Sequence, residues 1–369
     1  MNNPTIWKVG IAGCGNLAET VYMPQLKQVP NARVTAVYDR YPGRAKAMAD
    51  KFGYEKWYED LDTFLSDSDV EIVMSVGAIQ GRHEQNMKIL RAGKHLYSQK
   101  PFAPDVAAAT EQIEEAKRQG VLISTAPVHR NRPDIQTAQA AIEKGLIGHP
   151  SLLRVDINHG GPEYFQYRMS DPSWFYRKGA GALLDLGIHG VDQAVALMGP
   201  ATAVTARGVI SEPERLCRTG IMDGKTIKTD EIPDNYAITL EFASGALAVI
   251  TAGFVGKADY RKGGEIEIYG SRGTVCIEGG IAYNGSAPVH LFVDNPETGL
   301  RGWIDPLPFD LAPRGEYFQA LVIPDLIEAI ENGHRSHLYP EMSRHVIEIL
   351  AAVEQSVETG SRIQLQTTF

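Results

Sequence analysis

Titratable side chains recur at helical spacing within one apolar segment in the second half of the chain. Asp185, His189 and Asp192 lie four and then three residues apart, so a helix would place them on the same side. The other faces are apolar and suited to burial, with Leu183, Leu184, Leu186, Ile188, Val191, Ala194, Val195 and Leu197. An imidazole exchanges protons near neutral pH, so this segment is a candidate for acid–base chemistry. The alternative is an intrahelical Asp–His pair without a chemical role.

A second candidate is the glycine turn near the amino terminus. Lys8 to Ala12 is a short apolar run that predicts a strand, and a helical stretch follows the turn towards Lys27. The turn reads Gly-x-Gly-x-x-Ala, in which Gly13 and Gly15 permit a tight bend and the close approach of a pyrophosphate. At the start of the helix, the backbone N–H groups of Asn16, Leu17 and Ala18 would donate to the phosphate. The small side chain of Ala18 would also let the helix pack closely on the strand. The pattern predicts a dinucleotide site, against a merely structural turn.

The end of the predicted second strand bears on which dinucleotide would bind. Arg33 to Tyr38 reads as that strand, and Asp39 follows it directly. A carboxylate there accepts hydrogen bonds from the adenosine ribose and repels a 2'-phosphate, which favours NAD. Arg40 could pair with a 2'-phosphate, so NADP remains an alternative.

A third candidate is the triplet Gln99-Lys100-Pro101, which follows the predicted strand His95 to Ser98. The carboxyl ends of parallel strands line the ligand crevice of a doubly wound sheet. Proline fixes the local turn and favours an extended Lys100. We therefore expect Lys100 to lie beside the nicotinamide; alone, it would be read as a surface lysine.

The spacing of strands and helices predicts two domains of different architecture. In residues 1–126, strands alternate with helices, which predicts a doubly wound parallel sheet of the Rossmann type. Residues 127–369 contain several runs of alternating hydrophobicity with turn signals between them, which predicts an α+β domain built on a large, mostly antiparallel open sheet. Since helices would cover only one face of that sheet, we expect the other face to form subunit contacts in a homo-oligomer, a dimer or tetramer.

Together these motifs resemble the Gfo/Idh/MocA family of oxidoreductases, which includes glucose-fructose oxidoreductase and inositol dehydrogenase. Its members share a Gly-x-Gly-x-x-Gly/Ala turn, a Glu-Lys-Pro triplet and a Gly-Gly-Gly-x-Leu-x-Asp-x-Gly-x-His segment. The third segment is similar to Gly179 to His189, with Ala180 inside the glycine triplet. The resemblance implies an NAD-dependent enzyme that transfers hydride between nicotinamide and a secondary alcohol of a sugar, glycoside or cyclitol. It implies that Lys100, Asp185 and His189 are catalytic, with His189 as the base that removes the hydroxyl proton.

Two departures from the family pattern concern the cofactor side of the site. Gln99 replaces the usual glutamate, which keeps an acceptor and removes a negative charge next to Lys100. Gly77-Ala78-Ile79 replaces the common Thr-Pro-Asn, so the nicotinamide contacts at Gly77 are expected to come mainly from backbone.

The segment that leads into Asp185 is rich in aromatic and arginine residues. Aromatic faces stack on the C–H faces of sugars, and guanidinium groups donate to hydroxyls. We expect a substrate wall here, with Arg168, Trp174, Tyr176 and Arg177 as its candidates. The alternative is that these side chains only pack an interdomain seam or a subunit contact.

Two other functions stay open at this point. A tightly bound NAD could oxidise a sugar transiently and so permit elimination or glycoside cleavage. If Gln99 marks a degraded site, the chain would be a dinucleotide-binding sensor or scaffold. A zinc site would need His159 or Asp156 beside Asp185 and His189, and no ligand cluster marks it, so we expect no metal.

Bulk properties exclude several classes of partner. A net charge of -9 without a basic stripe argues against nucleic acid. No apolar run approaches the length of roughly 20 residues that spans a bilayer, and we find no signal peptide. The three cysteines are scattered, which is typical of a reducing compartment. We therefore expect a soluble cytoplasmic enzyme.

Overall fold

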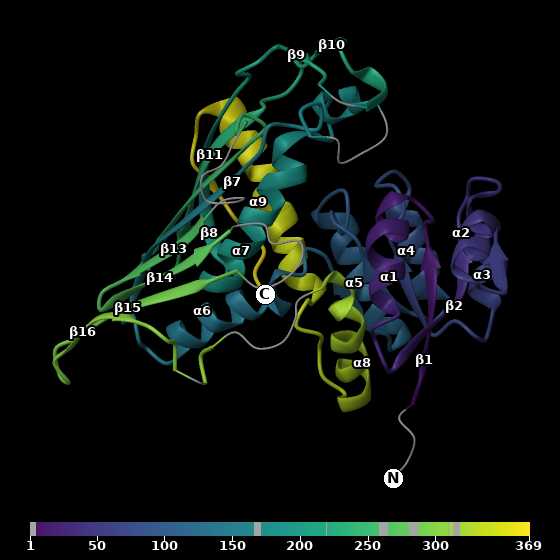
Figure 1. The fold of residues 1–369 in the computed structure, drawn as a ribbon, viewed down its shortest axis with the longest axis horizontal. Coiled ribbons are helices and arrows are strands. Elements are labelled where there is room, and N and C mark those ends of the chain that lie inside the picture. The colour runs from purple at the N-terminus through teal and green to yellow at the C-terminus, as the bar shows by residue number, and fades with distance from the viewer. Residues whose placement is uncertain are drawn as a thin grey trace. The chain divides into compact units, whose positions relative to one another are not determined.

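The computed structural model describes residues 5–165, 171–218, 220–257, 265–279, 287–308, 310–312 and 318–369. The chain divides into two compact units (Figure 1). Unit 1 comprises Met1–Asn131 and Tyr317–Ile347, and unit 2 comprises Arg132–Glu316 and Glu348–Phe369. The division near residue 131 lies close to the boundary expected at 126/127, whereas the return of residues 317–347 to unit 1 has no counterpart in the sequence analysis.

Unit 1 is built on a six-stranded parallel sheet in the order β3-β2-β1-β4-β5-β6. Its strands are β1 Trp7–Ala12, β2 Ala32–Tyr38, β3 Lys56–Tyr58, β4 Ile72–Ser75, β5 His95–Ser98 and β6 Ile123–Thr125. The central strands are short apolar runs that are almost wholly buried, as expected for a parallel sheet with both faces covered. The predicted Rossmann-type sheet is confirmed. The three-residue strand β3 was not predicted.

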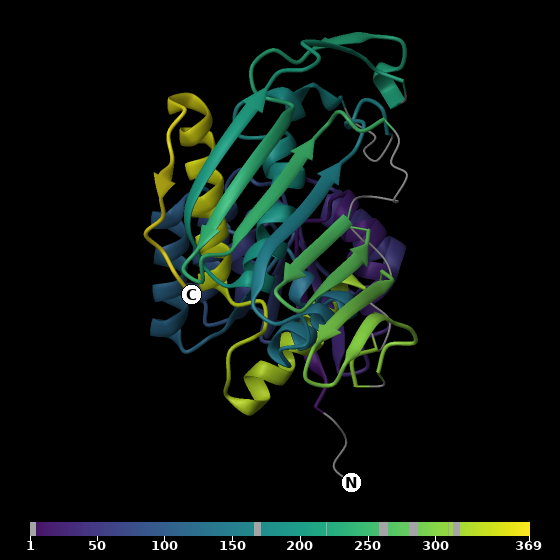
Figure 2. The ribbon, with the colours of Figure 1, turned by 90° about the vertical axis from the view of Figure 1, so that its left-hand side faces the viewer.

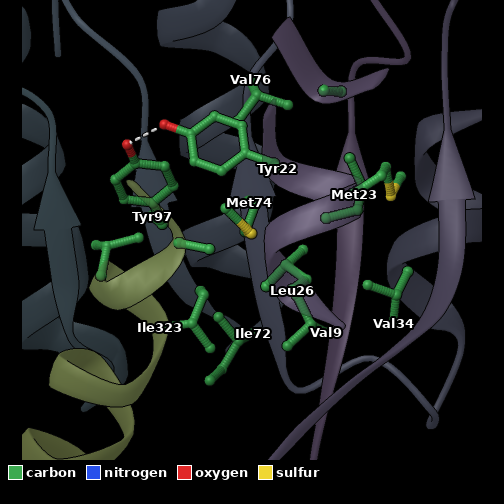
Figure 3. Packing of buried hydrophobic residues seen from close by; sticks show 14 of the residues in the cluster. Val9, Tyr22, Met23, Leu26, Val34, Ile72, Met74, Val76, Tyr97 and Ile323 are labelled. Carbon is green, nitrogen blue, oxygen red and sulfur yellow. Dashed lines mark hydrogen bonds between the residues drawn. The ribbon is translucent and has the colours of Figure 1, made fainter. Parts of the chain in front are cut away.

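Helices cover both faces of this sheet. They are α1 Met23–Leu26, α2 Arg44–Phe52, α3 Leu61–Ser66, α4 Arg82–Arg91, α5 Val106–Gln119 and α8 Val322–Asn332, with the π-helical turn η1 Ala18–Tyr22 before α1 and short turns η2 His129–Asn131 and η6 Gln319–Leu321. Local signals set some boundaries: Asp105 caps α5 by accepting from the Ala108 N–H at 2.8 Å, and Gly120 ends it at a φ of +67°. An apolar cluster on the sheet contains Tyr22, Met74, Tyr97 and Ile323 (Figure 3).

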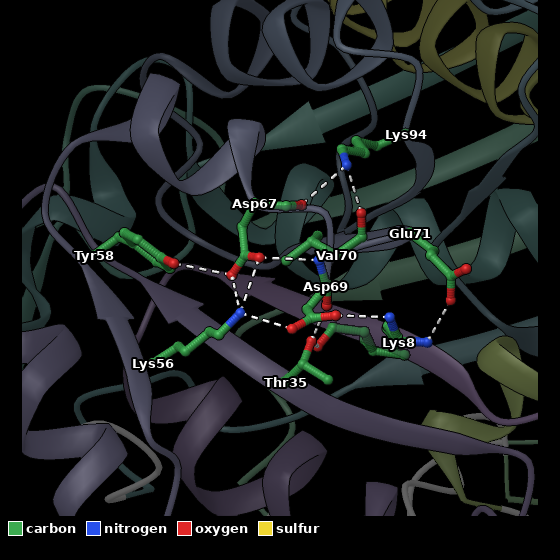
Figure 4. Close-up of polar contacts among 10 residues, drawn as sticks. Lys8, Thr35, Lys56, Tyr58, Asp67, Asp69, Val70, Glu71 and Lys94 are labelled. Atoms are coloured by element: carbon green, nitrogen blue, oxygen red, sulfur yellow. Dashed lines mark hydrogen bonds and ion pairs between the residues drawn. The ribbon is translucent and has the colours of Figure 1, made fainter.

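A charged cluster lies at the amino ends of the strands (Figure 4). Lys56 Nζ contacts Asp67 at 3.0 Å and Asp69 at 2.8 Å, and Lys8 Nζ donates to Asp69 at 2.7 Å. Lys94 donates to the Val70 carbonyl at 2.6 Å. These interactions tie β1, β3, β4 and β5 together at the sheet edge opposite their carboxyl ends.

Unit 2 is built on a nine-stranded sheet in the order β16-β15-β14-β13-β7-β12-β11-β8-β17 (Figure 2). Its strands are β7 Pro150–Asn158, β8 Ala201–Val209, β11 Asn235–Phe242, β12 Leu247–Gly253, β13 Glu265–Gly270, β14 Gly273–Glu278, β15 Val289–Asn295, β16 Leu300–Ile304 and β17 Ile363–Gln364, and β9 Glu214–Leu216 pairs with β10 Thr226–Lys228. Only the β7–β12 pair is parallel among these described pairings. The predicted large, mostly antiparallel sheet is confirmed.

Helices pack on one face of the unit 2 sheet (Figure 1). They are α6 Pro133–Glu143 and α7 Ile188–Met198, with the π-helical turn η4 Leu183–Gly187 before α7, and α9 Pro340–Thr359, which crosses the boundary between the units and bonds to β8 through Ser356. The short helices η3 Pro172–Tyr176 and η5 Gly220–Met222 lie in the connections between these elements. The other face exposes apolar side chains, including Leu247, Val249 and Trp303. In the described part of the chain, no helix covers this face, in agreement with the sheet open on one side that the sequence predicts.

Candidate active site

The glycine turn after β1 is held by close packing that only glycine allows. Gly13 has a φ of +116°, and a Cβ there would lie 2.4 Å from backbone atoms of Gly77. Its N–H donates to the Tyr38 carbonyl at 2.8 Å, which joins the turn to the end of β2. Gly15 has no heavy atom within 4 Å of an added Cβ, so its backbone faces the open space that a pyrophosphate needs. Ala18 is fully buried against the core.

Asp39 lies directly after β2 and is 5% exposed. Its Oδ2 accepts from the Cys14 N–H at 2.8 Å, and its Oδ1 accepts from the Tyr41 N–H at 2.8 Å. The carboxylate therefore fixes the glycine turn, and each oxygen keeps lone-pair capacity for a further donor. Arg40 beside it is exposed, and its guanidinium lies 5.1 Å from the Tyr41 ring centroid.

The amide of Gln99 organises the end of β5. Gln99 Oε1 accepts from the Lys100 N–H at 2.7 Å, and because that N–H can only donate, the orientation of the amide is set. Gln99 Nε2 then donates to the Tyr22 hydroxyl at 2.9 Å, which lies 2.6 Å from the Tyr97 hydroxyl (Figure 3). Burial raises the pKa of Tyr22, so its phenol stays protonated, and either hydroxyl can be the donor in the Tyr22–Tyr97 bond. Lys100 itself is half-buried.

Unit 1 thus gathers the predicted cofactor residues at one edge of its sheet. The carboxyl ends of β1, β2, β4 and β5 carry Gly13, Gly15, Asn16, Leu17, Ala18, Asp39, Arg40, Gly77, Gln99 and Lys100. Ligands of open α/β sheets bind at this edge, at the point where the strand order reverses. In this sheet that point lies between the neighbouring strands β1 and β4. The arrangement fits a dinucleotide.

In unit 2, Asp185 and His189 lie on a helix whose other positions are mostly buried. Asp185 belongs to the π-helical turn η4, and His189 lies in the first turn of α7; both side chains are half-buried. π-Helical turns inside helices are frequent at functional sites. Asp192, which the sequence groups with them on one face, is fully buried. A Cβ at Gly190 would lie 2.7 Å from Ile250, so glycine lets this helix pack closely on the sheet.

The predicted substrate segment contains both exposed and buried members. Trp174 is 38% exposed and stacks on Phe175 at a centroid distance of 3.8 Å. Arg177 is exposed and pairs with Glu231 at 2.7 Å. Tyr176 is 2% exposed, and its hydroxyl donates to Glu163. Arg168 lies outside the described residues.

A buried ion network that the sequence analysis missed supports this segment. Arg215 Nη1 donates to Glu163 at 2.8 Å, and Nη2 donates to Asp234 at 2.7 Å. All three side chains are 2% exposed or less, so the charges are paired in a low-dielectric setting. Glu163 therefore links Tyr176 to Arg215 on β9. No local sequence signal marks the three as partners.

The side chains weighed as additional zinc ligands contact other groups. Asp156 accepts from the Thr251 hydroxyl, on β12. His159 stacks on Phe254 at a centroid distance of 5.1 Å, and its Nδ1 accepts from the Gly161 N–H at 3.0 Å. Within the described residues, the His, Cys, Asp and Glu groups close enough to share an ion are Glu265, Glu267 and Cys276, on β13 and β14.

A six-stranded parallel sheet with a glycine turn after its first strand in the chain is typical of the Rossmann class of dinucleotide-binding domains. Residues 7–126 match the description "Oxidoreductase family, NAD-binding Rossmann fold", and residues 135–276 match "GFO/IDH/MocA C-terminal domain". The chain belongs to the Gfo/Idh/MocA family, as its motifs indicate.

Known relatives include enzymes of cyclitols and sugars. The chain is 28% identical to myo-inositol 2-dehydrogenase of Thermotoga maritima over 73% of this chain and 75% of that protein. It is 26% identical to D-apiose dehydrogenase of Rhizobium rhizogenes over 82% of each chain. A levoglucosan dehydrogenase in complex with NADH and levoglucosan has the same fold, with a TM-score of 0.79 and 21% identity over 98% of this chain and 100% of that one. In the part of the chain that the structure describes, no helix is long and apolar enough to cross a membrane.

Proposed function

We propose that this protein is an NAD-dependent dehydrogenase that oxidises a secondary alcohol of a sugar, glycoside or cyclitol. The observation that carries the proposal is the cluster at the carboxyl edge of the unit 1 sheet. This edge carries three features: a glycine turn with open space at Gly15, the carboxylate of Asp39 at the end of β2, and Lys100 at the end of β5. The cyclitol and sugar dehydrogenases among its relatives support the substrate class.

The residues of unit 1 would hold the dinucleotide in a defined way. Backbone N–H groups from Gly13 to Ala18 would donate to the pyrophosphate. The lone pairs that Asp39 keeps would accept from the adenosine ribose, and its negative charge would repel a 2'-phosphate, which favours NAD over NADP. Arg40 would line the same end, and the backbone at Gly77 and Gln99 would contact the nicotinamide side.

The catalytic groups we propose are Lys100, Asp185 and His189. When bound, NAD⁺ supplies the hydride acceptor. His189 removes the hydroxyl proton as the C–H bond gives up its hydride, and the ketone forms. Asp185 orients the imidazole or the substrate, and the Lys100 ammonium stabilises negative charge that develops on the oxygen. Trp174 and Arg177 are proposed to contact the sugar, together with Arg168. Tyr176, which is buried and donates to Glu163, is proposed to support this segment rather than to contact the sugar. We also propose a homo-oligomer that covers the open face of the unit 2 sheet.

The test of the catalytic assignment is Lys100→Ala, with Lys88→Ala as its control. Lys88 lies on α4 and pairs with the exposed Asp62 at 2.8 Å, which is not one of the site residues. We expect Lys100→Ala to retain NAD⁺ affinity measured by calorimetry and to lose about 100-fold or more in kcat, whereas Lys88→Ala changes neither. Unchanged turnover in a folded Lys100→Ala variant would refute the role of Lys100.

A further inference from the structure

Arg82 begins α4, and its guanidinium is buried where the chain leaves β4 and β5. Nη2 donates to the Gly77 carbonyl at 2.6 Å. Nη1 lies 3.0, 2.8 and 2.9 Å from the carbonyl oxygens of Gln99, Lys100 and Pro101. One side chain therefore binds the backbone of both loops that follow adjacent strands of the sheet.

The hydrogen-bond partners of Arg82 among the described residues are all backbone carbonyls, and no carboxylate pairs with it. The side chain is 5% exposed. Burial lowers the pKa of Arg82 to about 10, so it remains a cation near neutral pH. Burying a cation without an anionic partner is costly, so the contacts it makes must compensate. The two terminal nitrogens of a planar guanidinium donate in fixed directions, so one arginine can bond to two loops. A lysine donates from a single nitrogen and is less suited to hold both loops.

The two loops held by Arg82 are those of the candidate site. Gly77 lies against the glycine turn, where it leaves no space for a side chain at Gly13. On the other side, Lys100 receives a second restraint from the Gln99 amide through its own N–H. Arg82 thus connects the Gly77 backbone, which packs on the glycine turn, with the backbone of Lys100.

We propose that Arg82 is a positioning residue for hydride transfer, which fixes Lys100 and the Gly77 loop relative to each other. It touches neither the substrate nor the cofactor in this proposal. The role rests on the proposed function, since it assumes that the nicotinamide lies at these two loops. Loss of the guanidinium would let the loops shift, and a displacement of about 1 Å can reduce turnover by about 100-fold.

The test compares Arg82→Lys and Arg82→Gln with Arg91→Lys, a control on the same helix. Arg91 is exposed, and among the described residues its ion-pair partners are Glu111 at 3.7 Å and Glu115 at 3.8 Å. Affinities for NAD⁺ and for ADP-ribose, which lacks the nicotinamide, are measured by calorimetry well below the melting temperature, and kcat is measured with the best alcohol substrate. We expect both Arg82 variants to bind ADP-ribose within about twofold of wild type, to lose about fivefold or more in NAD⁺ affinity, and to lose about tenfold or more in kcat.

Two outcomes would overturn the proposal. One is a folded Arg82 variant whose NAD⁺ affinity and kcat stay within about twofold of wild type. The other is an equal loss of affinity for ADP-ribose and NAD⁺, which would mean that Arg82 only stabilises the fold. If the wild-type protein binds NAD⁺ and oxidises no alcohol, the dehydrogenase proposal fails, and the ratio of the two affinities still decides the role of Arg82.

Discussion

The hydrogen bond between Gln99 and Tyr22 offers a quantitative test of how the end of β5 is held. Tyr22 is fully buried and Gln99 is 8% exposed, so water cannot replace a lost partner. Tyr22→Phe removes a hydroxyl that is bonded to Gln99 at 2.9 Å and to Tyr97 at 2.6 Å. Leaving the buried Gln99 Nε2 without this partner costs about 1–3 kcal/mol, so we expect a loss of about 1–3 kcal/mol in the free energy of unfolding.

A double-mutant cycle isolates the bond itself. The variants are Tyr22→Phe, Gln99→Met and the double variant, with free energies of unfolding taken from urea titrations. We expect a coupling energy of about 1–2 kcal/mol, since the pair is buried and directly bonded. Tyr54→Phe is the control, because the hydrogen-bond partner of its hydroxyl in the described part of the chain is the weak acceptor Met23 Sδ at 3.5 Å; it should cost less than about 1 kcal/mol.

The same cycle, measured on kcat, separates positioning from stability. Gln99 bonds directly to the Lys100 N–H, whereas Tyr22 acts on Lys100 only through Gln99. The double variant should therefore turn over at the rate of Gln99→Met alone, and Tyr22→Phe should fall between that rate and wild type. Additivity within about 0.5 kcal/mol in both measurements would refute the reasoning.

Three further predictions follow from other contacts. Asp39→Asn should reduce the preference for NAD⁺ over NADP⁺ by about tenfold or more in paired calorimetric titrations; an unchanged ratio would contradict the assigned role. Glu163→Ala should cost about 3–5 kcal/mol in urea unfolding because it removes one anionic partner of the buried Arg215, whereas Glu231→Ala, which breaks an exposed pair, should cost less than about 1 kcal/mol. Hydrogen bonds from Lys56 and Lys8 lower the pKa of Asp69 to about 2, so the stability it adds is complete above the unfolded pKa of about 4 and is lost as pH falls towards 2. The gap in urea midpoint between wild type and Asp69→Asn should therefore shrink over that range, and a constant gap would contradict it.

Local patterns in the sequence were sufficient to predict the parallel sheet and the residues at its carboxyl edge. Gly13 and Gly15 stand between a buried strand and a helix, and Lys100 follows another buried strand, so strand ends and turn chemistry identify both. The strand β3 was missed because it has only three residues and none of them is buried. Alternation over so few residues gives no period to recognise.

Tertiary contacts explain what the sequence could not predict about the site. Gln99 and Tyr22 are separated by 77 residues, and Arg215 and Glu163 by 52, so no local spacing marks them as partners. Arg82 reads as an ordinary helical arginine, and only the fold shows that carbonyl groups surround it. Asp192 was placed on the polar face by α-helical spacing, and it is fully buried on a helix that begins with a π-helical turn.

The most direct test of the proposed function is a screen of cyclitols, aldoses and glycosides that follows the absorbance of reduced nicotinamide. Purified protein is supplied with NAD⁺ or NADP⁺, and His189→Ala and the exposed-site control His290→Ala are run in parallel. We predict that at least one compound is oxidised with NAD⁺ as the preferred acceptor, that His189→Ala abolishes this turnover while it still binds NAD⁺, and that His290→Ala matches wild type. Tight binding of NAD⁺ without net reduction by any compound would contradict a dehydrogenase that releases its cofactor after each turnover.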